Sequence, residues 1–435
     1  MTKKTNVVFF FPDEKIGGGP FYLIRLAVKL SEDEKYKVFY MDYKNGYSHK
    51  IEANTSRITF IDYKDYCSDI QFSEPCILFT PIYYLHNMPI IHKASKILFF
   101  NWHNLCLPVL QKNIGFSNSE LHSFLSIVQQ RNAEVFCDAA HREAHNSFGK
   151  VNFPDYYVPI SAEIKEGKAL TTLVSQDEIN IAVLGRLVTD KIFSLNNVIE
   201  NAEKLHSDKI INIHIIGDGD CKEEIKQIET NRVRLKMLGY MTGNELNDYL
   251  TTQVDILFAM GTSVLEGAAL GLPSVVCPND VAPITGNEFV WLFDVKDYCL
   301  GWEPHQVSFC ANKICTFEQI ISDIYEKHQK QQIGEQCRNF LKDKFNIEKN
   351  CGLLKKYLAK TCLSFNELQR IVRKTSQKSV FYIFGFIPVL AKIRNADIKK
   401  YNLFGFIPIF KIKENQKGKK YYFLNILFLK EKNVL

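Results

Sequence analysis

The segment from Val254 to Val276 constrains the fold more than any other part of the chain. An apolar run of strand length is broken by Gly-Thr-Ser at residues 261–263, and a helix of small residues follows until Gly271 and Pro273 end it before a second strand. In doubly wound sheets, the N–H groups and positive dipole at the start of such a helix hold phosphate groups. The segment therefore predicts an α/β fold with a phosphate site at this turn.

Glu266 lies three residues after Ser263, so spacing alone is equally compatible with a capping-box partner for the helix start. The run LEGAALGLP, residues 265–273, resembles the L-E-A-x-A-x-G-x-P signature of glycosyltransferase group 1, a family of nucleotide-sugar enzymes with the GT-B fold. This resemblance implies that Glu266 binds the ribose hydroxyls of a donor nucleotide, since a carboxylate can accept from both hydroxyls of a cis-diol. The earlier glutamate of the family, eight positions upstream, is Phe258 here, which leaves the stereochemical outcome open.

Further motifs follow the order of the same family. After the expected strand INIAVL, Gly185, Arg186 and Lys191 match G-R-L-x-x-x-K, and the resemblance implies that the two cations hold the donor diphosphate. A planar guanidinium and a mobile ammonium group suit that task, because they offset the charge on a departing nucleoside diphosphate. A solvated basic pair after a strand is the alternative. The sequence also places Gly217 at a turn after a strand, and LGY at residues 238–240 resembles an element that lies against the nucleobase.

The first half of the chain alternates strand-like and helical segments, beginning with an apolar run at residues 7–11 that we interpret as a strand rather than a signal peptide. Gly18 and Gly19 lie at the next strand-to-helix junction, where glycines allow a ligand to approach the backbone. The family has a glycine-rich loop at this place. His103 follows the strand ILFF, and the resemblance implies that it contacts the transferred sugar or the acceptor. A histidine that hydrogen-bonds a loop is the alternative.

Composition indicates a globular protein with room for two domains and an appendage: 435 residues, 46% hydrophobic and 23% charged. The twelve cysteines form no C-x-x-C pair, so we expect reduced thiols and a cytoplasmic location. His141 and His145 lie four residues apart on an expected helix, but a metal would need a third group and the H-E-x-x-H order, and here Glu143 is central. No metal site and no cofactor are therefore predicted.

The net charge of +6 is unevenly distributed, because residues 366–435 contain 15 Lys/Arg and 4 Asp/Glu, a net charge of +11. Within this region FGFIP occurs at residues 384–388 and again at 404–408, and basic residues follow each copy. Glycine and proline disfavour a continuous helix, so short β-like units are expected. We interpret the tail as an anchor to an anionic membrane surface, because aromatic and basic side chains suit the headgroup region. A small β-hairpin module packed on the body or on another subunit is the alternative, and no nucleic-acid partner is expected.

Together these features predict a GT-B architecture, in which two Rossmann-like domains face a cleft. Residues 1–162 form the acceptor domain, residues 163–362 the donor domain with returning helices, and residues 363–435 a basic aromatic tail of β character. On the resemblance, the expected catalytic residues are His103, Arg186 and Lys191, and the expected donor-binding residues are Gly18, Gly19, Gly185, Gly217, Leu238, Gly239, Tyr240, Gly261, Thr262, Ser263 and Glu266.

The resemblance further implies a retaining, metal-independent glycosyltransferase that moves a sugar from a nucleoside diphosphate, with UDP favoured, to a glycan or lipid-linked acceptor. Such an enzyme would act in bacterial capsule or lipopolysaccharide biosynthesis, at the inner face of the cell membrane. The alternatives are a GT-B sugar-nucleotide epimerase and a non-catalytic scaffold subunit that binds the sugar nucleotide.

Overall fold

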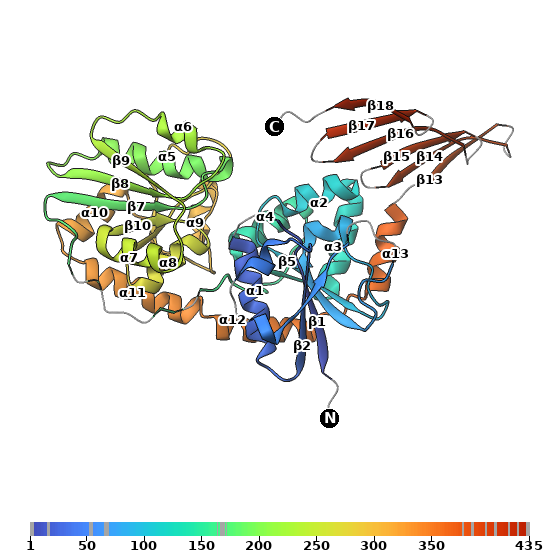
Figure 1. Cartoon of the computed structure of the whole chain (residues 1–435), viewed down its shortest axis with the longest axis horizontal. Coiled ribbons are helices and arrows are strands. Elements are labelled where there is room, and N and C mark those ends of the chain that lie inside the picture. Colours follow the sequence, from blue (N-terminus) through green and yellow to red (C-terminus); the bar gives the residue numbers. More distant parts are fainter. Residues whose placement is uncertain are drawn as a thin grey trace.

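Two α/β domains and a separate β-sheet make up the chain in the computed structural model (Figure 1). The structure describes residues 4–431 except for short gaps at 15–17, 52–54, 65–68, 163, 166–169, 171, 376–377, 384–386, 396–397, 404–406, 416–417 and 424–425. Among the described residues, no helix has both the length and the apolar character that a bilayer crossing requires.

The first domain is built on a six-stranded parallel sheet of order β3-β2-β1-β4-β5-β6. Its strands are β1 Thr5–Phe10, β2 Tyr36–Asp42, β3 Thr59–Asp62, β4 Cys76–Pro81, β5 Lys96–Asn101 and β6 Glu134–Phe136. Its helices are α1 Gly18–Ser31, α2 Cys106–Ile114, α3 Asn118–Gln130 and α4 Ala139–Gly149. The strand predicted at residues 7–11 is confirmed as β1.

The strands of the first domain are continuous apolar runs because both faces of the sheet are covered. Val7 and Phe9 pack with α1, whereas Val8 and Phe10 pack on the opposite face with α2, α3 and α4. This two-sided burial leaves the carboxyl ends of the strands and the loops that follow them as the accessible edge.

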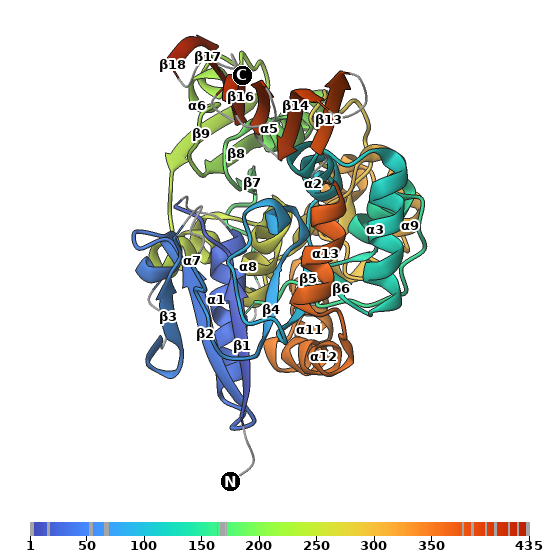
Figure 2. The same ribbon diagram turned by 90° about the vertical axis from the view of Figure 1, so that its right-hand side faces the viewer.

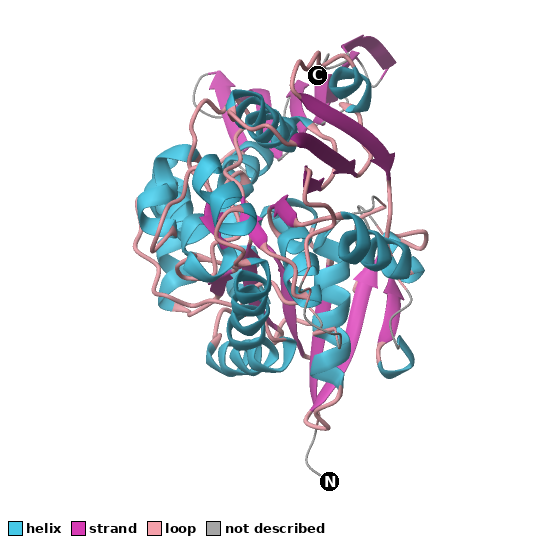
Figure 3. Cartoon of the chain, turned by 90° about the vertical axis from the view of Figure 1, so that its left-hand side faces the viewer, coloured by secondary structure: helices cyan, strands magenta, loops and turns pink. Residues whose placement is uncertain are grey.

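The second domain has a sheet of order β12-β11-β10-β7-β8-β9, parallel except for β12. Figure 3 shows helices packed against the strands on this side of the molecule. Its strands are β7 Glu178–Leu184, β8 Ile210–Ile216, β9 Val233–Gly239, β10 Ile256–Ala259, β11 Ser274–Val276 and β12 Val290–Trp291. Its helices are α5 Thr189–Lys204, α6 Lys222–Lys226, α7 Gly243–Gln253, α8 Thr262–Leu270, α9 Val307–Cys310, α10 Phe317–Tyr325 and α11 Lys330–Lys344. The strand, turn, helix and strand predicted for residues 254–276 are confirmed as β10, α8 and β11. Short 3₁₀ turns are η1 Tyr47–Lys50, η2 Thr55–Arg57, η3 Ile82–Asn87, η4 Leu292–Asp294 and η5 Pro304–Gln306.

The chain returns to the first domain after α11. Helix α12 (Ile347–Lys360) packs beside α1, where Lys29 Nζ lies 2.8 Å from Glu348 Oε1. Helix α13 (Phe365–Thr375) follows, and its Glu367 pairs with Arg131 of the first domain at 2.9 Å. The segment expected to be a tail of β character from residue 363 therefore begins with a helix docked on the first domain.

A six-stranded antiparallel sheet follows this helix, beyond the first domain (Figure 2). Each 20-residue unit spans one pair of these strands. The strands are β13 Lys378–Ile383, β14 Ile387–Asn395, β15 Ile398–Leu403, β16 Ile407–Asn415, β17 Gly418–Phe423 and β18 Ile426–Glu431. The first three residues of each FGFIP copy lie outside the described residues.

A buried ion pair fixes the start of β10 in the second domain. The Asp255 carboxylate is fully buried, and its Oδ1 lies 2.6 Å from Lys330 Nζ. The Tyr325 hydroxyl donates to Oδ2 at 2.8 Å and the Val174 N–H donates to Oδ1 at 2.9 Å. The pair is tolerated in the interior because the carboxylate has these additional donors.

We expect Lys330→Met to destabilise the protein by about 3–5 kcal/mol, because it leaves the Asp255 carboxylate buried without its cation. The matched control is Lys327→Met, whose ammonium pairs with Asp323 at 2.9 Å while 57% exposed, and this change should cost less than about 1 kcal/mol. Urea denaturation of both variants measures the difference, and equal midpoints would contradict the role given to the buried pair.

Candidate functional site

A cavity of 310 Å³ lies between the two domains, at the carboxyl ends of strands from both sheets. Helix α1 and the connecting segment around residue 162 form one side of it. The loops after β7, β8 and β9 and the first turns of α8 form the other side. Of the expected donor-binding residues, those in its lining are Gly18, Gly185, Gly217, Tyr240, Thr262, Ser263 and Glu266, and the expected catalytic residue Arg186 lines it as well.

The first turn of α8 opens directly into this cavity. Only Met260 and Gly261 separate α8 from β10, and Gly261 makes the turn with a φ of 59°. No side chain caps the helix. Thr262 and Ser263 line the cavity. The positive end of the helix dipole at this uncapped start therefore lies beside the cavity.

The amino terminus of α1 meets that of α8 across the cleft. A Cβ atom added to Gly18 would lie 2.8 Å from Thr262 Oγ1, so the two domains approach within van der Waals distance here. A larger residue at position 18 would require the Thr262 side chain to move. Because both helix starts carry partial positive charge, the space between them favours an anion.

Close backbone contact also positions the loop that carries Arg186. Gly217 has a φ of 151°, and a Cβ atom at this position would lie 1.8 Å from the Gly185 carbonyl oxygen. Glycine is therefore required after β8, and its absent side chain lets the loops after β7 and β8 lie against each other. The Gly217 N–H also donates to the Gly239 carbonyl at 2.8 Å, which joins the loop after β9 to the same arrangement.

Glu266 binds a lysine and does not cap its own helix. Lys165 Nζ lies 2.6 Å from Glu266 Oε2 and 2.8 Å from Asn247 Oδ1. The lysine comes from the segment that joins the two domains, and Arg338 donates to its backbone carbonyl at 3.0 Å. The capping-box alternative for Glu266 is wrong, because α8 begins at Thr262 without a side-chain cap.

Sequence reasoning did not find two cations of the cavity, Lys165 and Arg25. Lys165 lies in a connecting segment without periodicity, so no local signal marked it. Arg25 could have been found, because Gly18, Phe21 and Arg25 lie at positions i, i+3 and i+7 of α1 and share one face of the helix.

The three residues expected to be catalytic lie in different environments. Arg186 is an exposed residue of the cavity lining. Lys191 lies in the first turn of α5 and is not one of the described residues that line the cavity. His103 is exposed after β5, where its Nδ1 accepts from the Leu105 N–H at 3.0 Å, and it too lies outside the lining. The roles of Lys191 and His103 stay predictions.

The element expected to contact a nucleobase contributes mainly Tyr240, which is 53% exposed and lines the cavity. Leu238 packs against the core, and the Gly239 carbonyl is used by Gly217. Gly19 does not line the cavity, because it packs against the Trp102 ring. Gly19, Leu238 and Gly239 therefore lie behind the residues that line the cavity.

Phe258, at the position of the missing glutamate, lies in β10 and is fully buried. Its ring centroid lies 5.4 Å from that of Phe289 and 5.5 Å from that of Phe317. A side chain at this position points into the core because the short turn before α8 keeps it within the strand. It therefore contributes nothing to the cavity.

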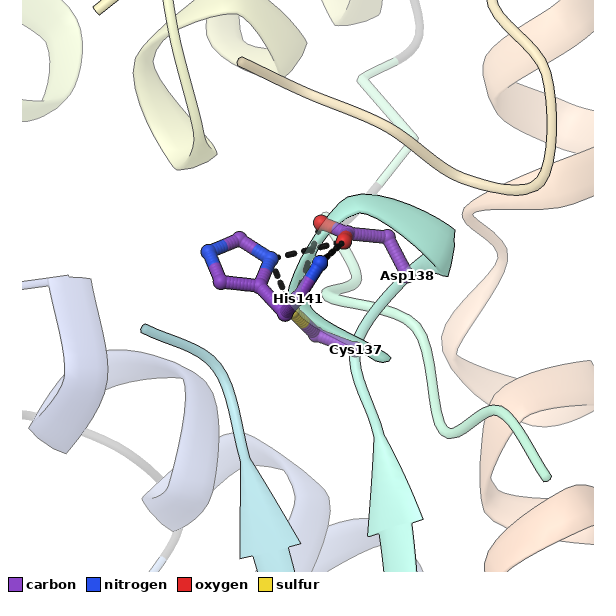
Figure 4. Close-up of side chains that lie close together, drawn as sticks. All are labelled: Cys137, Asp138 and His141. Carbon is purple, nitrogen blue, oxygen red and sulfur yellow. Dashed lines mark hydrogen bonds and ion pairs between the residues drawn. The ribbon is translucent and has the colours of Figure 1, made fainter. Parts of the chain in front are cut away.

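The two histidines of α4 do not share a site. His141 Nδ1 lies 2.6 Å from Asp138 Oδ1 at the helix start (Figure 4). His145 Nε2 lies 3.1 Å from Glu134 Oε2, and both side chains are buried. Each imidazole thus has its own carboxylate partner.

The fold is similar to that of solved glycosyltransferase-like structures. The Anabaena protein HepE in complex with UDP and glucose matches with a TM-score of 0.50 and 12% identity over 82% of this chain and 99% of that chain. HepE in complex with UDP matches with a TM-score of 0.50 and 11% identity over 82% and 100%. A glycosyltransferase from Rickettsia africae matches with a TM-score of 0.49 and 14% identity over 82% and 100%. No family model and no curated protein matches the sequence. The chain has the GT-B fold, as the sequence predicted.

We expect Gly217→Ala to destabilise the second domain more than Gly239→Ala. Both glycines have positive φ, which costs alanine about 1–2 kcal/mol, but a Cβ atom at Gly239 meets no atom within 4 Å. At Gly217 the same atom must also displace the Gly185 carbonyl. Thermal denaturation of the two variants tests this difference, and equal midpoints would show that the loops can separate without cost.

Proposed function

We propose that this GT-B protein binds a nucleoside diphosphate sugar between its domains and transfers the sugar to an acceptor held by the first domain. The observation that carries the proposal is the convergence of the α1 and α8 amino termini with Arg186 and Glu266 on one cavity. A diphosphate needs N–H donors and a cation, and a ribose needs a carboxylate that can accept from two hydroxyls. The cavity offers both within one wall.

In this proposal the diphosphate lies at the start of α8, beside Thr262 and Ser263, and Arg186 binds its oxygens. These groups stabilise the negative charge that develops as the bond between the sugar and the diphosphate breaks, which is the main electrostatic contribution to such a reaction. Lys191 would add a second positive charge beside the diphosphate when domain closure or donor binding brings its side chain nearer. Glu266 would accept from the ribose hydroxyls, with Lys165 fixing the position of its carboxylate.

UDP is the proposed nucleotide because the HepE structures of the same fold hold UDP, one of them together with glucose. We further propose a glycan or lipid-linked acceptor in surface-polysaccharide assembly on the cytoplasmic side of the membrane. Transfer with retention and without a metal ion belongs to the same proposal, since Arg186 and the helix termini can supply the positive charge that a metal would otherwise provide.

A second candidate function is binding of the sugar nucleotide without transfer. The burial of Phe258 favours it, because the glutamate that the resembled family places there would contact the donor sugar and has no counterpart at this position. The two candidates differ in one measurement. Release of UDP from a UDP-sugar in the presence of acceptor supports transfer, whereas tight binding without turnover supports the scaffold.

We expect UDP to bind the cavity and Arg186→Ala to weaken that binding by about 10- to 150-fold, the equivalent of a charged hydrogen bond of about 1.5–3 kcal/mol. The matched control is Arg234→Ala, an exposed arginine of β9 outside the cavity lining. Isothermal titration calorimetry with UDP, GDP, ADP and CMP measures both variants. Equal affinity of wild type and Arg186→Ala would refute the diphosphate contact.

The ribose contact can be tested by changing both partners. Wild type should bind UDP more tightly than 2′,3′-dideoxy-UDP by about 10-fold or more, because the dideoxy nucleotide lacks the hydroxyls that Glu266 accepts from. Glu266→Ala should bind the two nucleotides equally. If Glu266→Ala keeps the full preference, another group recognises the ribose.

The proposed membrane contact rests on the charge and composition of the C-terminal segment. Residues 366–435 contain 15 Lys/Arg and 4 Asp/Glu, a net charge of +11, and aromatic residues recur in each repeat. Basic side chains are attracted to anionic lipid, and aromatic side chains suit the headgroup region. A polyanionic membrane surface is therefore the proposed partner of this segment.

We expect the protein to bind vesicles that contain phosphatidylserine and not to bind vesicles of pure phosphatidylcholine. Replacing Lys411, Lys413 and Lys420 by Glu should reduce binding about 100-fold, since each lysine near an anionic surface contributes about 1 kcal/mol. The control replaces Lys112, Lys204 and Lys342, three exposed helix lysines of the two α/β domains, with the same change in charge. Vesicle sedimentation measures binding of both variants and of a chain truncated after residue 375. Equal loss of binding in the two triple variants would contradict a contact made by the C-terminal segment.

A further inference from the structure

A group of three metal-ligand side chains lies outside the donor cavity, at the end of β6 and the start of α4 (Figure 4). The Cys137 Sγ atom lies 3.2 Å from His141 Nδ1 and 3.3 Å from Asp138 Oδ2, and His141 Nδ1 lies 2.6 Å from Asp138 Oδ1. Cys137 and Asp138 are 1% and 3% exposed, whereas the His141 side chain is 21% exposed. A thiol, a carboxylate and an imidazole thus point at one place near the surface.

The geometry does not suit a nucleophilic relay. In a Cys-His-Asp relay the thiol and the carboxylate bind different nitrogens of the imidazole, so that a proton can pass through the ring. Here both approach the same nitrogen, Nδ1, and the opposite side of the ring points away from them (Figure 4). Cys137 is also too deeply buried to reach a substrate. Asp138 uses Oδ2 towards the thiol and Oδ1 towards Nδ1, and Oδ1 also caps α4 by accepting from the His141 N–H at 2.9 Å. The three side chains thus converge as the ligands of one cation would, with Oδ2 as the carboxylate oxygen that is not used by the helix cap.

We propose that Cys137, Asp138 and His141 bind a zinc-type divalent ion. A thiolate, an imidazole and a carboxylate are the ligand types that Zn²⁺ takes, and three protein ligands leave a fourth position for water. With tetrahedral angles and the usual Zn²⁺ distances, the ligand atoms lie about 3.4–3.6 Å apart, so the group must open by a few tenths of an ångström and somewhat more between His141 and Asp138. The ion replaces the thiol proton, which passes to solvent, and the imidazole keeps its proton on Nε2.

Cys137, Asp138 and His141 lie where the first domain contacts the second, so an ion bound there would stabilise this contact region. The Ala139 N–H, between Asp138 and His141, donates to the Asp297 carbonyl of the second domain at 3.1 Å. The Cys137 N–H donates to the Asn101 carbonyl at the end of β5 at 2.9 Å. A bound ion therefore fixes β6 to α4 at the edge where the two domains touch. This inference does not depend on the proposed donor site.

The test uses the full-length protein after treatment with EDTA. Titration with Co²⁺ should give one equivalent of a cobalt–thiolate charge-transfer band in the near ultraviolet, which Zn²⁺ then removes by displacement. The band should be absent in Cys137→Ser and the Co²⁺ affinity at least 10-fold lower in His141→Gln. Cys362→Ser, which alters an exposed thiol, is the matched control and should keep the band.

Zn²⁺ should also raise the melting temperature of wild type and Cys362→Ser but not of the two ligand variants. A wild type without the thiolate band, or a Cys137→Ser variant that keeps it, overturns the proposal. If Cys137→Ser does not fold, the His141→Gln variant provides the test, because His141 is partly exposed and its replacement disturbs the core less. Unchanged Co²⁺ affinity in His141→Gln overturns the proposed site, and a 10-fold loss of affinity supports it.

Discussion

The contact between the starts of two helices, α1 at Gly18 and α8 at Thr262, is the feature on which the rest of the site depends. It brings two positive helix ends close together between the domains, and glycine at position 18 leaves room for the Thr262 side chain. The turn of two residues before α8 keeps the helix start at the edge of the sheet and leaves it without a capping side chain. The cavity forms around this point because the loops after β7, β8 and β9 surround it.

Segments that join the two domains make contacts both away from the cavity and within it. Helix α12 leaves the second domain and packs beside α1, and α13 continues along the first domain through Arg131 and Glu367. Lys165, in the connecting segment, reaches Glu266 in the second domain and is itself held by Arg338. The segments that join the domains therefore also shape the proposed ribose site.

Two further places in the molecule lie outside the donor cavity. Residues 366–435 carry a net charge of +11, which favours an anionic surface as a partner. At the start of α4, the Cys137 thiol and the Asp138 carboxylate both approach the same imidazole nitrogen of His141, and the proposed cation would bind all three side chains.

The sequence by itself determined the order of strands and helices, the Gly-Thr-Ser turn before α8 and the choice of Arg186 and Glu266, both of which line the cavity, because these depend on local periodicity and on fixed spacing along the chain. That α8 starts without a capping side chain was decided by the structure. Only the tertiary structure decided which groups meet. It paired Lys165 with Glu266 across 101 positions, placed Phe258 in the core and left His103 outside the cavity. Such contacts join residues that are distant in the chain. The spacing of residues within one segment reports only local structure, so it cannot predict which residues meet when two domains pack together.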